Sequence, residues 1–165
     1  MPETTRLLPV VLLLSTWCLK AHGQEPSRGF AVQGDLGVVK FLDYRAHGAV
    51  GGSVRLPFSK RWAFQPEFQY LWADRGHDDF VLLPNVSFDF RRPPARVRPF
   101  VILGVGMTLV RERFGALQRT RTWWHGSAGG GVKVFLNRRW FVAPDFRIGI
   151  EPHSRFTVGV GYEFR

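Results

Sequence analysis

Residues 62–72 (WAFQPEFQYLW) alternate between two kinds of side chain with a period of two. A period of two indicates a β-strand, because successive side chains of a strand point to opposite faces. One face is large and mainly aromatic: Trp62, Phe64, Pro66, Phe68, Tyr70 and Trp72. The other face is mostly polar, with a carboxylate at its centre: Ala63, Gln65, Glu67, Gln69 and Leu71. This combination is typical of a transmembrane strand that has lipid on one side and a small polar lumen on the other.

The same alternation recurs along the chain and predicts eight strands separated by turn signals. The predicted strands cover residues 29–41, 49–58, 62–72, 79–90, 99–110, 123–136, 140–150 and 156–164. Each has roughly the ten-residue length that a tilted transmembrane strand requires. Tight connectors alternate with longer ones, among them a predicted loop at 111–122, although the connector at 151–155 is short. The pattern predicts an all-β fold, an eight-stranded antiparallel up-and-down transmembrane β-barrel.

The first 23 residues are typical of a secretory signal peptide. Arg6 supplies a basic start, residues 7–14 (LLPVVLLL) form an apolar core, and residues 21–23 (AHG) place small side chains where signal peptidase cleaves. The apolar run is too short to cross a bilayer as a helix. Cleavage after Gly23 leaves a barrel domain at 24–165 and removes Cys18, the one cysteine, so we expect no disulfide, cysteine nucleophile or cysteine metal ligand.

The net charge of +10 and the sequence pI of about 11 raise the question of nucleic-acid binding. The basic residues form no single patch, and many occupy short connectors: Lys60, Arg61, Arg91, Arg92, Arg96, Arg98, Arg138 and Arg139. Cations at turns suit a barrel rim that faces anionic lipid headgroups. We therefore expect outer-membrane lipid and lipopolysaccharide as partners, and no nucleic acid. The aromatic residues near strand ends are predicted to form interfacial girdles rather than a base-stacking platform: Trp62, Tyr70, Trp72, Trp123, Trp124, Trp140 and Tyr162.

Four segments of the sequence resemble those of a known family: FQPEFQYLW, RPFVILGVGMTL, GGGVKVFLNRRWFVAPDFRIG and VGVGYEFR. They resemble the third strand, the glycine-rich fifth strand, the hairpin of the sixth and seventh strands, and the closing strand of outer-membrane barrels of the OmpA/OmpX type. The resemblance covers residues 29–165. It implies a barrel in the cell outer membrane whose closing aromatic, here the penultimate Phe164, is read by the barrel-assembly machinery. We expect a monomer without a cofactor, with a structural or loop-mediated binding role.

Charged side chains of both signs are predicted on the inward faces of the strands. The acidic members are Asp35, Glu67, Asp89, Asp145 and Glu163, and the basic members are Arg55, Lys133 and Arg147. In a narrow eight-stranded barrel these groups should pair and block water flow. The candidate cluster is Arg55, Glu67, Lys133, Asp145, Arg147 and Glu163. Arg55 with Glu67, and Lys133 with Asp145, flank the same tight turns, so both pairs and Glu163 are expected in the periplasmic half.

Three other functions remain open from the sequence. Breaking and re-forming one lumen ion pair would make the protein a small-solute or ion pore. A lipid-modifying enzyme would need His153 and Ser154, near Glu151; lipid A deacylases, however, place His and Ser one residue apart in a strand, and adjacent side chains of an extended chain point apart. The histidines at 22, 47, 77 and 125 have no metal-ligand spacing, so we expect neither a catalytic nor a metal site. A soluble lipocalin-like barrel would need the aromatic faces inside.

Overall fold

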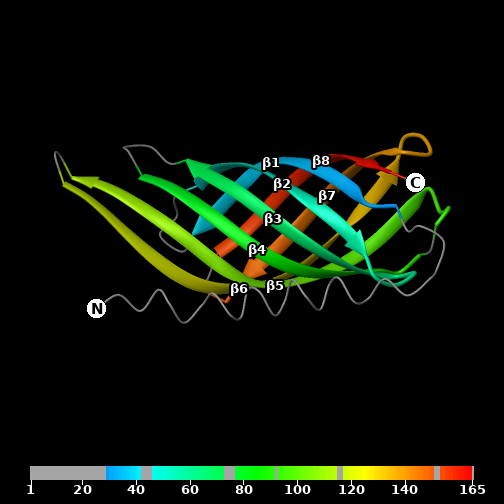
Figure 1. Cartoon of the computed structure of the whole chain (residues 1–165). Coiled ribbons are helices and arrows are strands. Elements are labelled where there is room, and N and C mark those ends of the chain that lie inside the picture. The colour runs from blue at the N-terminus through cyan, green and yellow to red at the C-terminus, as the bar shows by residue number, and fades with distance from the viewer. Residues whose placement is uncertain are drawn as a thin grey trace.

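The computed structural model describes residues 29–41, 46–72, 77–91, 93–114, 117–150 and 153–164. Within them the chain forms eight antiparallel strands that close into a barrel in sequence order, with β1 bonded to β8 (Figure 1). The strands are β1 Ala31–Phe41, β2 Ala46–Pro57, β3 Trp62–Trp72, β4 His77–Asp89, β5 Val97–Phe114, β6 Leu117–Phe135, β7 Trp140–Gly149 and β8 His153–Glu163. The predicted eight-stranded antiparallel barrel is confirmed. In the described ranges no helix is long and apolar enough to cross a membrane. The predicted signal peptide lies outside them.

The barrel is turned inside out relative to a soluble protein. In β3 the exposed and buried positions alternate, and the aromatic face is the exposed one. Phe68 is 48% exposed and Phe146 49%, whereas Glu67 is 2% and Lys133 3% exposed. Burying charge while exposing large apolar side chains is unfavourable in water and favourable in a bilayer, where acyl chains cover the outer face. The arrangement is the one predicted from the alternation, and it is opposite to that of a lipocalin-like barrel.

The two ends of the barrel differ. At one end β1 begins and β8 finishes, and the Phe164 backbone N–H donates to the Phe30 carbonyl at 2.7 Å. Residues 58–61, 90–96 and 136–139 connect strands at this same end, which we call the termini end. At the opposite end β5 and β6 reach further than the other strands (Figure 1), and we call it the hairpin end.

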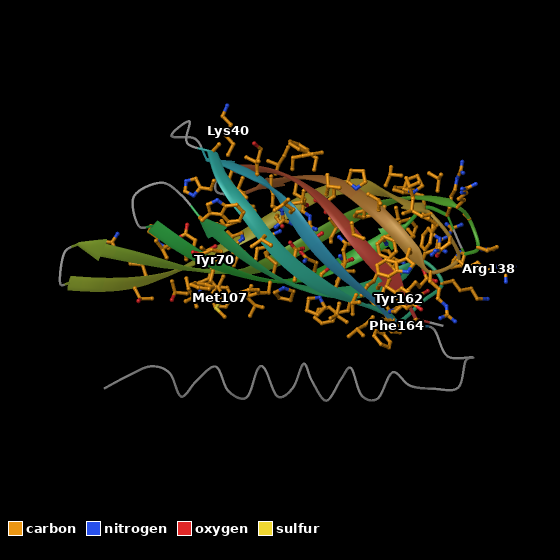
Figure 2. All side chains as sticks on the ribbon, turned by 90° about the horizontal axis from the view of Figure 1, so that it is seen from above. Lys40, Tyr70, Met107, Arg138, Tyr162 and Phe164 are labelled. Carbon is orange, nitrogen blue, oxygen red and sulfur yellow. The ribbon has the colours of Figure 1, made fainter. Side chains whose placement is uncertain are left out.

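Aromatic side chains gather near both ends of the outer face. At the termini end Trp62 packs against Phe88, with ring centroids 4.8 Å apart, and Trp140 packs against Tyr162 at 5.1 Å. Toward the hairpin end Tyr70 packs against Phe80, at 5.2 Å. Figure 2 shows Tyr162 and Phe164 near one end and Tyr70 displaced toward the other. Two bands that contain tryptophan and tyrosine, separated by apolar side chains, match the interfacial girdles of membrane barrels.

The predicted loop at 111–122 is wrong. Backbone pairing between β5 and β6 continues to Phe114 and Leu117, so most of this segment is strand. Alternation continues through it in the form of arginines and β-branched threonines, which favour strands without adding apolar side chains to the pattern. The predicted connector at 151–155 is also too long, because β8 begins at His153.

The girdle prediction needs one correction, at Trp123. Trp123 and Trp124 are neighbours in β6 and therefore point to opposite faces. Trp124 shares the face of the lipid-facing Val132 and Val134, whereas Trp123 continues the inward face. Trp123 is nevertheless 47% exposed, because this part of β6 extends past the last residue of β7 that pairs with it.

Candidate functional site

The centre of the lumen holds a buried carboxylate between two guanidinium groups. Glu67 of β3 lies 2.8 Å from Arg147 of β7 and 2.8 Å from Arg155 of β8, measured between the closest nitrogen and oxygen atoms. In an eight-stranded closed barrel β3 and β7 lie on opposite walls, so the pair of Glu67 and Arg147 spans the lumen. The Asn85 amide also donates to Glu67, at 3.3 Å. We call these side chains, together with Asp145, the central cluster.

Two further contacts hold the arginines of the central cluster from the sides. Arg147 pairs with Asp145 two residues earlier in the same strand, at 3.2 Å. Arg155 donates from Nη1 to the Gln69 side-chain oxygen at 2.6 Å. All these side chains are buried. A fully buried ion pair is strongly held only when such additional hydrogen bonds satisfy its atoms.

Glycines of β6 make room for the charges of β7. Gly129 lies opposite Arg147 in the ladder, and Gly131 lies opposite Asp145. A Cβ atom added at Gly129 would come within 2.7 Å of Arg147 Cγ, and one added at Gly131 within 2.8 Å of Asp145 Cβ. The nearest atom in each case is a backbone carbonyl oxygen of β7, that of Phe146 or Pro144, so any larger residue would push β7 and its charged side chains away from β6. The glycine-rich run of β6 is needed for close side-chain approach.

A second group of charges, which we call the mouth cluster, lies at the termini end. Asp89 of β4 accepts from Arg55 of β2 at 2.7 Å and from Lys133 of β6 at 2.8 Å. Arg98 of β5 donates to Glu163 of β8 at 3.0 Å. Two aromatic rings support the cations: the Arg98 guanidinium lies 4.0 Å from the Phe135 centroid, and the Lys133 ammonium 4.8 Å from that of Phe100.

The six predicted lumen residues all point inward and take part in these two clusters. The structure divides them, however: Glu67, Asp145 and Arg147 lie in the central cluster, and Arg55, Lys133 and Glu163 lie in the mouth cluster. The expectation that both cross-turn pairs lie toward the termini end is therefore wrong for Glu67 and Asp145. The ladder explains the difference, because Ser53 rather than Arg55 lies opposite Glu67, and Gly131 rather than Lys133 lies opposite Asp145.

Sequence reasoning missed two of the charges that complete the clusters. Arg98 and Arg155 were placed in predicted connectors, but they lie in β5 and β8 and are buried. Each has the parity of the inward residues in its own strand, such as Phe100 and Thr157. Extending the alternation by one or two residues past the predicted strand ends would have found both.

The inward face toward the hairpin end is less charged. Val39, Leu71, Val81 and Leu83 form a buried apolar layer there with Ala49. Next to it lies a cavity of about 40 Å³. Its polar lining is contributed by Gln69, Thr108, His125, Ser127, Arg147, His153 and Arg155. This volume holds only a few water molecules, on the order of two or three.

The structure separates the pair proposed for lipid-modifying chemistry. His153 and Ser154 are successive residues of β8 rather than loop residues, and only His153 lines the inner cavity. His125 and Ser127 have the one-residue spacing in a strand that sequence reasoning did not notice. Both are buried inside the barrel, where His125 Nδ1 lies 3.2 Å from Thr108 Oγ1 and its ring 5.6 Å from that of His153. Acyl chains on the outer face do not reach these groups. Among the described residues no three His, Cys, Asp or Glu side chains are grouped as metal ligands.

Comparison with solved structures identifies the fold. The N-terminal β-barrel domain of Pseudomonas aeruginosa OprF matches with a TM-score of 0.68 and 13% identity, over 85% of this chain and 100% of that chain. Neisserial surface protein A matches with a TM-score of 0.70 and 12% identity, over 82% and 97%. The Pseudomonas aeruginosa outer membrane protein OprG matches with a TM-score of 0.63 and 11% identity, over 84% and 97%.

At these identities the similarity shows a shared fold. The chain has the fold of the eight-stranded outer-membrane barrels, and the resemblance to the OmpA/OmpX type is confirmed at that level. No protein-family model and no curated protein matches the chain.

Proposed function

We propose that the protein is a bacterial outer-membrane barrel that presents the β5–β6 hairpin for binding at the cell surface, with a lumen closed to solutes. The observation that carries the binding role is an edge of β6 beyond the barrel wall that no strand of the described residues pairs with. In this proposal the termini end faces the periplasm and the hairpin end lies outside the cell. The same proposal includes removal of residues 1–23 as a signal peptide and recognition of Phe164 by the barrel-assembly machinery. It also includes a monomeric state.

The outer surface supports a membrane location. Aliphatic side chains lie between the two aromatic bands, where the acyl chains of outer-membrane lipid would contact them. Exposed cations surround the termini end at the connectors: Lys60, Arg61, Arg91, Arg96, Arg138 and Arg139. They suit the anionic headgroups of the periplasmic leaflet. Lipopolysaccharide would contact the opposite aromatic band.

The free edge belongs to residues 117–125 of β6. The last bond to the β7 side runs from the Ile150 N–H to the Gly126 carbonyl, at 2.9 Å. Backbone groups of successive residues in a strand point to alternate sides, so the even-numbered residues before Gly126 also direct their N–H and C=O groups away from β5. These residues are Thr120, Thr122 and Trp124, and in the described part of the chain no strand pairs with them on that side.

An unpaired edge of this kind binds an extended segment of another protein by adding a strand. The side chains around it provide specificity, because Trp123 and Trp124 are exposed on opposite faces and Arg121 is exposed beside them. Aromatic and arginine side chains are those enriched at binding hot spots. The partner proposed for this edge is therefore an extended segment of a protein outside the cell.

Substitution of Thr122 by proline is expected to abolish such binding. Proline removes the free N–H, and an edge strand tolerates it because no bond of the β5 ladder is lost. Peptides selected from a random library on the purified wild-type barrel serve as probes, and their affinity is measured for each variant. Thr122→Val keeps the N–H and the β-branched shape, so it should bind as the wild type does. Equal binding by the proline and valine variants would contradict strand addition.

The ion pair that joins Glu67 and Arg147 across the lumen supports the proposed closed state. The purified protein is therefore expected to produce no regular conductance steps in planar bilayers at neutral pH. Reproducible steps of fixed size would support the alternative function, a small-solute or ion pore in which these pairs re-form. A catalytic role is not proposed, because His125 and His153 line the inner cavity, whereas acyl chains would lie outside the barrel.

A further inference from the structure

The larger cavity of the barrel opens at the termini end and has a volume of about 330 Å³. Residues of seven of the eight strands line it, and β3 contributes only through the turn that joins it to β2. Its floor is the mouth cluster, described above through Arg55, Asp89, Arg98, Lys133 and Glu163. Volumes of a few hundred Å³ are typical of sites for small organic ligands rather than for single ions.

The charges that line this cavity do not balance. Four cations contribute to the lining, Arg55, Lys60, Arg98 and Lys133, against two carboxylates, Asp89 and Glu163. Asp89 pairs with both Arg55 and Lys133, and Glu163 pairs with Arg98, so the three cations of the mouth cluster exceed its two carboxylates by one charge. A buried charge is costly unless a counter-charge compensates it, and an anion entering from solvent would do so.

An unused donor is present at the same place. The Nη2 atom of Arg55 bonds to Asp89 at 2.7 Å, but its Nε atom is buried and has no hydrogen-bond partner among the described residues. A guanidinium offers its N–H groups as a planar fork that matches the oxygen spacing of phosphate. Several buried polar atoms of the described residues have no hydrogen-bond partner, and Arg55 is the one of these residues that lines this cavity. A bound anion would supply the missing partner of its Nε atom.

Part of the cavity lining is apolar. Phe135 and Phe141 line it together with Ala31, and the two rings lie 5.3 Å apart between centroids. Phe135 also holds the Arg98 guanidinium against its face, at 4.0 Å. A ligand that fills this space therefore needs one anionic group near Arg55 and Lys133 and an uncharged organic part beside the two phenylalanines.

We propose that this cavity binds a phosphate-bearing small molecule, with the phosphate held by Arg55, Lys133 and Lys60. Such a phosphate has two sources near the termini end: a soluble phosphate monoester, or the headgroup of an anionic phospholipid. The site is independent of the β6 edge at the hairpin end.

The test uses the full barrel purified in a neutral detergent and isothermal titration calorimetry with glycerol 1-phosphate. One saturable site is expected, with glycerol and acetate giving no saturable heat. Phosphatidylglycerol added to the micelles is the second arm. Competition with glycerol phosphate identifies a lipid headgroup as the source, and absence of competition identifies a soluble ligand; both outcomes support the site. Binding of acetate as tight as that of glycerol phosphate, or no saturable binding of either phosphate, overturns the proposal.

Variants distinguish this site from general attraction to a basic rim. Arg55→Gln should weaken binding at least about tenfold, the effect of losing one charge-assisted hydrogen bond. Asp89→Asn removes the competing carboxylate and should tighten binding, a change that a purely structural role for Asp89 does not predict. Lys60→Gln changes an exposed turn residue and should weaken binding without affecting folding.

The matched control is Arg139→Gln. Arg139 is an exposed cation at the same end that bonds to the Tyr162 hydroxyl at 2.7 Å and does not line the cavity. Its loss should leave binding unchanged. Each variant is first checked for the folded, heat-modifiable band on gels. Equal weakening by Lys60→Gln and Arg139→Gln would show that the rim attracts phosphate without a site.

Discussion

Substitution of Glu67 by glutamine is expected to lower the free energy of unfolding of the barrel by about 3–5 kcal/mol. Glutamine has nearly the same shape but no charge, so Arg147 and Arg155 would remain buried without their shared carboxylate. Removal of one partner from a buried ion pair leaves an uncompensated charge in a region of low dielectric constant. Urea unfolding in phospholipid vesicles, followed by tryptophan fluorescence, measures the change.

Two controls separate the effect of charge from the effect of shape. Glu163→Gln also removes a lumen carboxylate, but the Glu163 side chain is 16% exposed at the open mouth, whereas that of Glu67 is 1% exposed, so the loss should be smaller, about 1–3 kcal/mol. Adding Arg155→Gln to Glu67→Gln removes one of the stranded charges and should recover part of the stability. If the double variant is no more stable than Glu67→Gln, buried charge is not the cause.

The alternation of the strands could be predicted because the bilayer imposes the same requirement on every membrane-spanning strand. Each membrane-spanning strand must hide polar side chains from lipid, and the alternation from Phe64 to Tyr70 is therefore nearly free of exceptions. The pattern weakens where strands leave the bilayer. In β6 residues 119–122 alternate arginine with threonine, so neither set of alternate positions is apolar and the pattern predicts a loop.

The ion-pair partners were not predictable from the order of residues. Asp89 in β4 pairs with Arg55 of β2 and Lys133 of β6. Glu67 in β3 pairs with Arg147 on the opposite wall. Which side chains meet across the lumen depends on the stagger between strands around the whole barrel, which closes only when all eight ladders are in register. The turn-based expectation used two neighbouring strands and ignored the other six. Inward orientation is a local property, whereas pairing across the lumen is a global one.

Introduction of arginine at Phe68 should destabilise the barrel by about 2–4 kcal/mol in phospholipid vesicles, because a charge near the bilayer midplane loses its hydration. Phe68 lies near the middle of β3 and is 48% exposed on the outer face. In water an arginine at such an exposed position would change stability by only about 0.5 kcal/mol. Reversible urea unfolding in vesicles measures the difference between the variant and the wild type.

The matched substitution is Leu136→Arg. Leu136 is also apolar and exposed, but it directly follows β6 at the termini end, where arginine can reach headgroups and water. Its cost should be about 0–1 kcal/mol. The depth dependence is the decisive feature, because loss of packing alone would affect both sites without regard to their distance from the membrane centre. Equal costs at the two positions, or a negligible cost at Phe68, would mean that the exposed apolar face does not lie in lipid.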